Sequence, residues 1–216
     1  MNYKTIDMDS FPRRAHFEYF KGLAYPYVGF TVNVDITGFL AQQKRLGLPF
    51  YLALSYCVTR AANSVPEFRR RIHGDGIIEY DWCHGSHTVA LPDDTYCYCT
   101  LDCRMPFDEY LPCAAEAWER AKAASSIEDG EDADSLLFFS SIPWMSFTSV
   151  IQPTPSPADS NPRINWGRYF RQDGKVLLPL AVLCNHALVD GLHISRFYSA
   201  LDRELAELTD RLGDMG

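Results

Sequence analysis

The stretch Asn185-His186-Ala187-Leu188-Val189-Asp190-Gly191 joins an apolar run to an amphipathic pattern and decides how the end of the chain folds. The run before it, residues 176–183, is almost wholly apolar and has the length of a buried strand. The residues after it place apolar side chains three and four positions apart, which predicts a helix with one apolar face. His186 is therefore expected at the end of a rigid strand, a position that suits a catalytic base.

Outward from this stretch, the sequence predicts strands and helices in irregular order. Helices are expected over residues 12–22, 37–47, 50–65 and 107–124. Strands are expected over residues 27–36, 77–80, 88–91, 95–101 and 136–142. Because strands and helices do not alternate steadily, we expect an α/β fold in which a two-layer mixed β-sheet has helices packed on one face.

The length and composition suit one domain over residues 1–216, because no Gly/Ser-rich linker or charge block divides the chain. The net charge of -8 argues against a nucleic-acid polymer as the main partner, since phosphate binding needs a basic field. No apolar run reaches the roughly 18 residues that span a bilayer, and the N-terminus lacks a signal-peptide core. No membrane partner and a cytoplasmic location are therefore expected.

His186 has a neutral form that can accept a proton near pH 7, as general-base activation of a hydroxyl requires. A lone histidine in a strand is more often a core residue whose hydrogen bonds are satisfied. Asp190 could orient His186 in a triad with Ser140 or Ser146 as the nucleophile, or it could cap the last helix. The sequence has no GxSxG elbow, so a covalent serine mechanism has little support.

The seven cysteines are an odd number, and in a reducing compartment they are expected to be free thiols. Cys184 lies two residues before His186, which puts both on one strand face, but a buried thiol is commoner there than a nucleophile. Residues 83–103 contain several cysteines and histidines, but their Cys-x-Cys spacing lacks the two-residue gap of zinc sites. Strand alternation places Cys97 and Cys99 on one core face, and no metal is expected.

Three segments together resemble the chloramphenicol acetyltransferases. Residues 186–193 match the HxxxDGxH signature of that family. Residues 138–149 resemble its second signature and residues 13–18 its N-terminal one, in the same order and spacing over nearly the whole chain. HxxxDG alone would also fit the lipoamide acyltransferase cores, which share the fold, so the three segments in register make the resemblance specific.

The resemblance implies an acetyl-CoA-dependent O-acetyltransferase that is a homotrimer with active sites at the subunit interfaces. Acetyl-CoA would be a cosubstrate, with no permanently bound cofactor and no metal. His186 would be the general base that deprotonates the acceptor hydroxyl, which then attacks the thioester carbonyl directly. Ser140 would donate a hydrogen bond to the oxyanion of the tetrahedral intermediate, a contribution of roughly 3 kcal/mol.

Further residues take their expected roles from the same resemblance. Asp190 matches a structural carboxylate and Arg13 its ion-pair partner, which makes the apparent triad a false lead. Trp144 and Tyr169 match aromatic positions near CoA, and Arg168 matches a basic position that can meet a CoA phosphate.

The expected acceptor pocket departs from the family pattern. Its residues are Phe20, Tyr96, Tyr98, Phe138, Arg163 and Asn165. Phe20 stands where a tyrosine is familiar, and Asn165 replaces a threonine. Tyr96 and Tyr98 occupy positions usually held by a phenylalanine and a small residue, and Arg163 puts a cation where the family has an aliphatic side chain. Such a pocket is more polar and more crowded, so the acceptor is expected to be chloramphenicol or another small hydroxylated compound.

Two other functions fit parts of the pattern. A non-catalytic trimeric relative that binds a small molecule or CoA would account for the altered pocket, but the presence of both His186 and Ser140 counts against it. A lipoamide-type acyltransferase core would share the HxxxDG signature, but no lipoyl-domain or subunit-binding segment is recognisable in the sequence.

Overall fold

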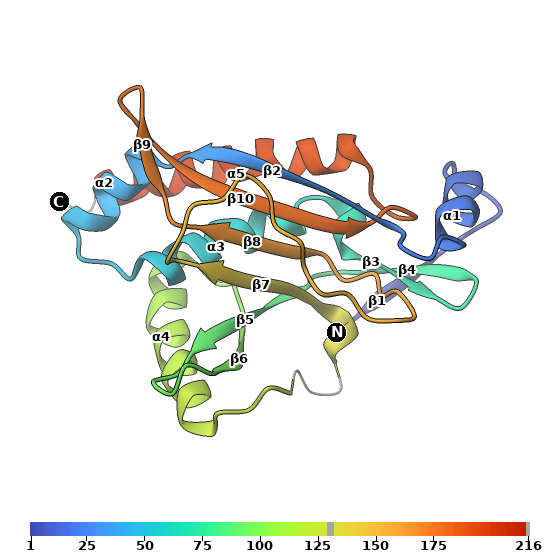
Figure 1. Ribbon diagram of the computed structural model, residues 1–216, viewed down its shortest axis with the longest axis horizontal. Helices are drawn as coiled ribbons and strands as arrows, with labels where there is room; N and C mark the ends of the chain where they lie inside the picture. The colour runs from blue at the N-terminus through green and yellow to red at the C-terminus, as the bar shows by residue number, and fades with distance from the viewer. Residues whose placement is uncertain (129–131, 215–216) are drawn as a thin grey trace.

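A mixed sheet forms the centre of the fold. The computed structural model describes residues 1–128 and 132–214, and in that part of the chain the main sheet has seven strands (Figure 1). Six of them lie in the order β2-β10-β8-β7-β5-β6, and β9 pairs with the start of β10. β7 runs parallel to β5 and β8, whereas the other paired strands are antiparallel. The strands are β2 (Tyr27–Asp35), β5 (His84–Ala90), β6 (Tyr96–Leu101), β7 (Leu136–Ile142), β8 (Arg163–Gly167), β9 (Phe170–Gln172) and β10 (Lys175–Asn185).

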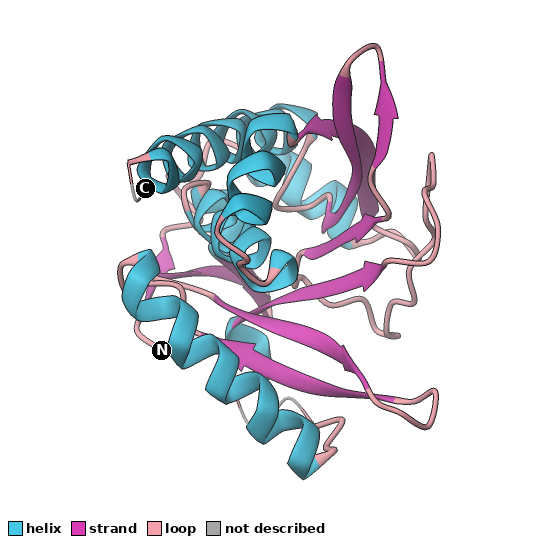
Figure 2. Cartoon of the chain, turned by 90° about the vertical axis from the view of Figure 1, so that its left-hand side faces the viewer, coloured by secondary structure: helices cyan, strands magenta, loops and turns pink. Residues whose placement is uncertain are grey.

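Helices cover one face of this sheet. α3 (Phe50–Asn63) and α5 (Gly191–Gly213) pack against each other, with α2 (Thr37–Arg45) beside α5 and α4 (Phe107–Ala124) beside β6. Figure 2 shows these four helices gathered on one side of the strands, and α1 (Arg14–Lys21) lies apart from them in Figure 1. The predicted α/β fold, a mixed sheet with helices on one face, is confirmed. None of the helices in residues 1–128 and 132–214 is long and apolar enough to cross a membrane.

A second, smaller sheet was not predicted. Its strands β1 (Tyr3–Ile6), β4 (Gly76–Tyr80) and β3 (Arg70–His73) pair antiparallel in that order. A short 3-10 helix, Pro66–Arg69, leads into β3, and another, Ala133–Ser135, leads into β7. Only β4 carries the apolar character that marks a strand in the sequence. β1 and β3 are short and rich in polar or charged residues, so only their pairing identifies them.

Tertiary pairing also moved several element boundaries. β5 begins at His84, four residues before the predicted strand 88–91, because its first residues pair with both β6 and β7. β8 follows a proline-rich stretch and showed no strand pattern, but it pairs on both sides. In both cases the backbone hydrogen bonds of the sheet outweigh weak local propensity.

The start of α5 is fixed by a reciprocal cap. The Asp190 carboxylate accepts from the backbone nitrogens of Leu192 at 3.0 Å and His193 at 3.4 Å. The backbone nitrogen of Asp190 donates in turn to Nδ1 of His193 at 3.0 Å. The capping role of Asp190 was one of its predicted alternatives. Thr37 is the first residue of α2, as predicted, and the Asp35 carboxylate accepts from its backbone nitrogen.

A long connection crosses the sheet face that the helices leave uncovered. Residues 143–162 join the end of β7 to the start of β8. Because β7 and β8 are parallel, this connection has to travel back along the strands before β8 can begin. Figures 1 and 2 show it passing over the face opposite the helices, and the space beneath it becomes the candidate site.

Candidate active site

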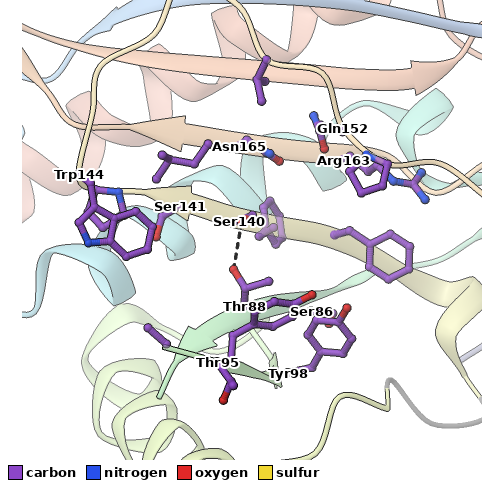
Figure 3. A pocket seen from close by; sticks show the side chains of 18 of the residues that line it. Ser86, Thr88, Thr95, Tyr98, Ser140, Ser141, Trp144, Gln152, Arg163 and Asn165 are labelled. Carbon is purple, nitrogen blue, oxygen red and sulfur yellow. Dashed lines mark hydrogen bonds between the residues drawn. The ribbon is translucent and has the colours of Figure 1, made fainter. Parts of the chain in front are cut away.

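A cavity of about 600 Å³ lies between this connection and the sheet. Strands β5, β6, β7 and β8 form its floor, and residues 142–144 and 150–153 form its rim (Figure 3). Its volume falls in the roughly 300–1,000 Å³ range of small-molecule sites. Its hydroxyl and amide side chains, leaving the tyrosines aside, are Ser86, Thr88, Thr95, Ser140, Ser141, Gln152 and Asn165.

Ser140 stands near the middle of this floor. It lies on β7 in register with Asn165 of β8, and Asn165 lies in register with Ala181 of β10. The Thr88 hydroxyl on β5 donates to Ser140 Oγ at 3.1 Å (Figure 3). Ser140 and Asn165 both line the cavity, so a carbonyl group bound there would meet a hydroxyl and a carboxamide.

The structure gathers most of the predicted acceptor residues in this cavity. Those that line it are Tyr96, Tyr98, Phe138, Arg163 and Asn165. Phe20 is not among the lining residues. Its ring instead stacks on the imidazole of His186, with the centroids 3.8 Å apart and the planes 23° from parallel. Within this chain, Phe20 therefore lies beside His186 and does not form part of the pocket wall.

Arg163 does not present an unpaired cation to the cavity, although the sequence predicted a cationic wall. Its two terminal nitrogens donate to the two carboxylate oxygens of Asp159 at 2.8 and 2.7 Å, and its guanidinium lies over the Phe138 ring. The Asp159 carboxylate also accepts from the Tyr27 hydroxyl, and its carbonyl accepts from the Asn185 side chain at 2.8 Å. Burial lowers the pKa of Arg163, but the hydrogen bonds to Asp159 and the charge of that carboxylate, with smaller contributions, together raise it above its ordinary value, so Arg163 stays charged.

The residues expected to contact CoA lie at or near the cavity mouth. Trp144 forms part of the rim and is 71% exposed. The backbone nitrogen of Arg168 donates to the carbonyl of Met145 at 2.8 Å, which brings the exposed Arg168 beside the Trp144 turn. Tyr169 is half-buried next along the chain, and the Lys44 ammonium lies over its ring. An indole face and two cations here suit an anionic ligand that carries aromatic and phosphate groups.

His186 is held rigidly just after the end of β10. Its backbone nitrogen donates to the carbonyl of Pro26 at 2.7 Å, and Phe20 covers one face of its ring. Its Nδ1 lies 2.9 Å from the carbonyl oxygen of Val189. Because a carbonyl can only accept, Nδ1 carries the hydrogen in this bond and Nε2 keeps its lone pair. This is the tautomer that a base acting through Nε2 requires.

Asp190 points to Arg13 and to the start of α5 and does not orient His186. An ion pair joins its carboxylate to the Arg13 guanidinium, and both side chains are mostly buried. Burial raises the pKa of Asp190, but the hydrogen bond from Arg13 and the nearby His193 and Arg13 together lower it below its ordinary value, so the group stays ionised. Since the Nδ1 partner of His186 is the Val189 carbonyl, the arrangement is not a Ser-His-Asp triad.

Ser140 and His186 of one chain lie far apart. Ser140 shares a row of the sheet with Ala181, and His186 comes five residues after Ala181, just beyond the end of β10. At about 3.4 Å per residue and 4.8 Å per strand, this separation is about 17 Å along the strands and about 10 Å across them. Proton transfer needs hydrogen-bond contact of about 3 Å. One chain therefore cannot bring both side chains to the same small acceptor.

The cysteines show no arrangement for chemistry. β10 ends at Asn185, so His186 belongs to a turn and the predicted shared face with Cys184 is wrong. Cys184 is fully buried, and burial raises the pKa of its thiol well above the ordinary value. Cys97 and Cys99 are buried on the core face of β6, as alternation predicted. Within residues 1–128 and 132–214, no three His, Cys, Asp or Glu side chains are grouped as metal ligands would be.

Two residues of the site were missed in the sequence, namely Thr88 and Asp159. Thr88 contacts Ser140 only because β5 and β7 are neighbours, and no short-range pattern reveals that pairing. Asp159 lies in the proline-rich connection four residues before Arg163, outside any helix that would bring such a pair together.

Comparison with known proteins shows which family this chain resembles. The family model described as chloramphenicol acetyltransferase matches residues 1–202.

The chain belongs to the chloramphenicol acetyltransferase family.

A chloramphenicol acetyltransferase of Clostridium perfringens is 31% identical over 99% of this chain and 100% of its own length. One of Streptomyces acrimycini is 30% identical, with 94% of each chain covered, and one of Escherichia coli is 29% identical, with 93% of each chain covered. The resemblance read from the three signature segments is thus confirmed, and as a chloramphenicol acetyltransferase family member the protein is an acyltransferase.

Solved structures agree on the fold. A chloramphenicol acetyltransferase superposes with a TM-score of 0.82 at 24% identity, covering 94% of this chain and 100% of that chain. The cubic core of the pyruvate dehydrogenase multienzyme complex superposes with a TM-score of 0.63 at 21% identity, covering 90% and 87%. At these identities both likenesses concern the fold alone.

Proposed function

We propose that the protein transfers an acetyl group from acetyl-CoA to a hydroxyl of chloramphenicol or of another small hydroxylated compound. The observation that carries this proposal is the presence of two complementary half-sites on one chain. One is a cavity with Ser140 on its floor, and the other is a rigid turn that leaves Nε2 of His186 with its lone pair. The relatives compared above are all chloramphenicol acetyltransferases, which supports chloramphenicol as the first acceptor to test.

The proposed reaction is a direct transfer with His186 as general base. Nε2 of His186 takes the proton of the acceptor hydroxyl while the hydroxyl oxygen attacks the thioester carbonyl carbon. Ser140 donates to the carbonyl oxygen as it becomes an oxyanion, where a fixed donor acts with most effect. When the tetrahedral intermediate collapses, the carbon–sulfur bond breaks and the CoA thiolate takes the proton from His186. The products are the acetyl ester and CoA, and neither a metal nor a bound cofactor takes part.

A homotrimer would bring the two half-sites together. The separation of Ser140 and His186 within one chain supports a site in which His186 of one subunit faces the Ser140 cavity of the next. Exposed apolar side chains lie on α1, in the connection from α1 to β2, on β2 and in the first turn of α5, and such patches mark subunit contacts. They are Tyr19, Leu23, Tyr25, Phe30, Val32 and Leu192. In this arrangement Phe20 reaches the acceptor from the histidine side.

The two substrates are proposed to enter from different directions. The indole of Trp144 and the cations of Arg168 and Lys44 would meet CoA at one mouth, with Tyr169 beside them. Tyr96, Tyr98, Phe138, Arg163 and Asn165 would hold the acceptor. Acetylation of chloramphenicol in the cytoplasm, where acetyl-CoA is present, would make antibiotic resistance the biological role.

Release of CoA thiol by the purified protein tests this proposal. Acetyl-CoA is supplied with chloramphenicol and, in parallel, with a panel of small hydroxylated compounds, and the acetyl ester is identified by mass. We expect thiol release that depends on an acceptor and matches the ester in amount. Release with another compound but not with chloramphenicol would change the acceptor and keep the mechanism. Bound CoA with no transfer to any compound would overturn the proposal.

A further inference from the structure

The Thr88 side chain hydrogen-bonds the Ser140 hydroxyl on the cavity floor. The two residues lie on the neighbouring parallel strands β5 and β7 and continue the register that pairs His87 with Phe139. Their hydroxyl oxygens are 3.1 Å apart, and both side chains line the cavity (Figure 3).

The direction of this bond decides what Ser140 can do. A serine hydroxyl has one hydrogen to donate and two lone pairs that accept. Either hydroxyl can donate across this contact, but when Ser140 donates its hydrogen to a ligand in the cavity, its lone pair is left to accept from Thr88. Hydrogen bonds in such a chain polarise one another, so the donation by Thr88 strengthens the donation by Ser140.

The backbone of Thr88 leaves its side chain little freedom. Its strand β5 lies between β6 and β7, and Thr88 itself pairs with Tyr98 of β6. Its neighbours His87 and Val89 are buried in the core, which fixes the strand against rotation. A β-branched side chain in a strand also has few rotamers. Thr88 therefore offers its hydroxyl to Ser140 with little loss of conformational entropy.

We infer that Thr88 is a positioning residue that aims the Ser140 hydroxyl at the oxyanion. This rests on the proposed role of Ser140 as the oxyanion donor. The chain of donation runs from Thr88 to Ser140 and from Ser140 to the carbonyl oxygen of the thioester. Thr88 touches no reacting atom, and its contribution appears only when charge develops on that oxygen.

A double-mutant cycle on the full-length enzyme tests this inference. Thr88→Val removes the hydroxyl at constant shape, and Thr88→Ser keeps the donor. Each is combined with Ser140 and with Ser140→Ala, and kcat, both KM values and the pH profile of kcat are measured. Thr100→Val on β6 is the matched control, since Thr100 neither lines the cavity nor contacts Ser140. If Thr88→Val does not fold, Thr88→Ala replaces it.

We expect Ser140→Ala to lower kcat by about 10²- to 10³-fold, and Thr88→Val to lower it by about 3- to 10-fold with both KM values and the pH midpoint unchanged. Thr88→Ser should recover most of the rate. In the Ser140→Ala background, Thr88→Val should have no further effect.

Each other result has a distinct meaning. An equal loss from Thr88→Val in both backgrounds would show that Thr88 does not act through Ser140 and would overturn the inference. No loss from Thr88→Val, with Ser140→Ala still impaired, would overturn the inference and leave the proposed function standing. Full activity of Ser140→Ala would overturn the oxyanion role of Ser140 and the inference with it.

Discussion

The Ser140 cavity and the His186 turn lie on the same sheet but are held in different ways. Strand pairing and side-chain hydrogen bonds fix the cavity floor, and its concave wall is rich in hydroxyl and amide groups. Backbone contacts and the stacked ring of Phe20 fix the turn, and α1 and β2, which lead to it, carry exposed apolar side chains. The cavity has the means to bind a small acceptor but no histidine, and the turn has a histidine but no cavity. Each region supplies what the other lacks.

The largest expected effect comes from removing the base. His186→Ala should lower kcat by about 10³- to 10⁴-fold, because general-base catalysis at a hydroxyl is lost. Acceptor binding to the Ser140 cavity should persist, since His186 does not line it. Thiol release and acceptor titration measure the two effects separately. His16→Ala, on the exposed face of α1, is the control. An equal loss of acceptor affinity would show that the turn and the cavity are not separate regions.

Mixing two inactive variants tests the division directly. A trimer assembled from His186→Ala chains and Ser140→Ala chains contains some interfaces in which both residues are intact. For random mixing in a ring of head-to-tail contacts, roughly a quarter of the sites are intact, so activity should recover to roughly a quarter of wild type. The measurement is thiol release after co-expression, compared with each variant alone. If both residues acted from one chain, mixing would restore nothing.

The two regions differ in how far the sequence reveals them. The His186 turn is local, since an apolar strand, HxxxDG and an amphipathic helix follow one another, and its position was predicted correctly. The cavity is assembled from strands far apart in sequence, and β8 showed no strand pattern at all. The oxyanion role of Ser140 and the set of acceptor residues were therefore available only through family resemblance. Neither a local sequence pattern nor the family resemblance pointed to Thr88 or Asp159. Their partners are set by strand pairing and by the path of residues 143–162.

An intermediate effect is expected from changing Asp159, which links the cavity wall to the His186 turn. The Asp159 carboxylate neutralises Arg163 in the cavity wall, while its carbonyl holds Asn185 beside the turn. Asp159→Asn removes the charge and keeps the carbonyl. We expect KM for the acceptor to rise about 10-fold, since hydrogen bonds to charged groups contribute about 1.5–3 kcal/mol. KM for acetyl-CoA and the pH profile of kcat should not change.

A second variant makes this prediction specific. Arg163→Leu combined with Asp159→Asn leaves no unpaired cation, and part of the lost acceptor affinity should return because a buried unpaired charge costs more than a missing pair. An equal rise in KM for acetyl-CoA after Asp159→Asn would instead indicate a general loosening of the connection over residues 143–162. Steady-state kinetics with each substrate varied in turn distinguish these outcomes.

The smallest expected effect concerns the support beneath the turn. The Arg13–Asp190 ion pair joins the start of α1, which carries Phe20, to the start of α5. Asp190→Asn keeps an N-cap side chain and removes only the charge. We expect the free energy of unfolding at pH 7 to fall by about 1–2 kcal/mol, as measured in urea at fixed protein concentration. Because the cavity does not depend on this pair, KM for the acceptor should stay the same while kcat falls a few-fold.

The pH dependence of the stability lost in Asp190→Asn tests whether the ion pair is the cause of that loss. The pKa of Asp190 in the folded protein lies below its ordinary value of 3.8. A carboxyl group with a lowered folded pKa stabilises the protein fully above its unfolded pKa and loses that contribution as the pH falls through the folded pKa. The wild-type and Asp190→Asn unfolding free energies should therefore differ fully at pH 5 to 7 and converge as the pH drops below 3.8. A difference that stays constant down to that range would assign the effect to the helix cap and its packing, and the turn would then be supported by local backbone contacts alone.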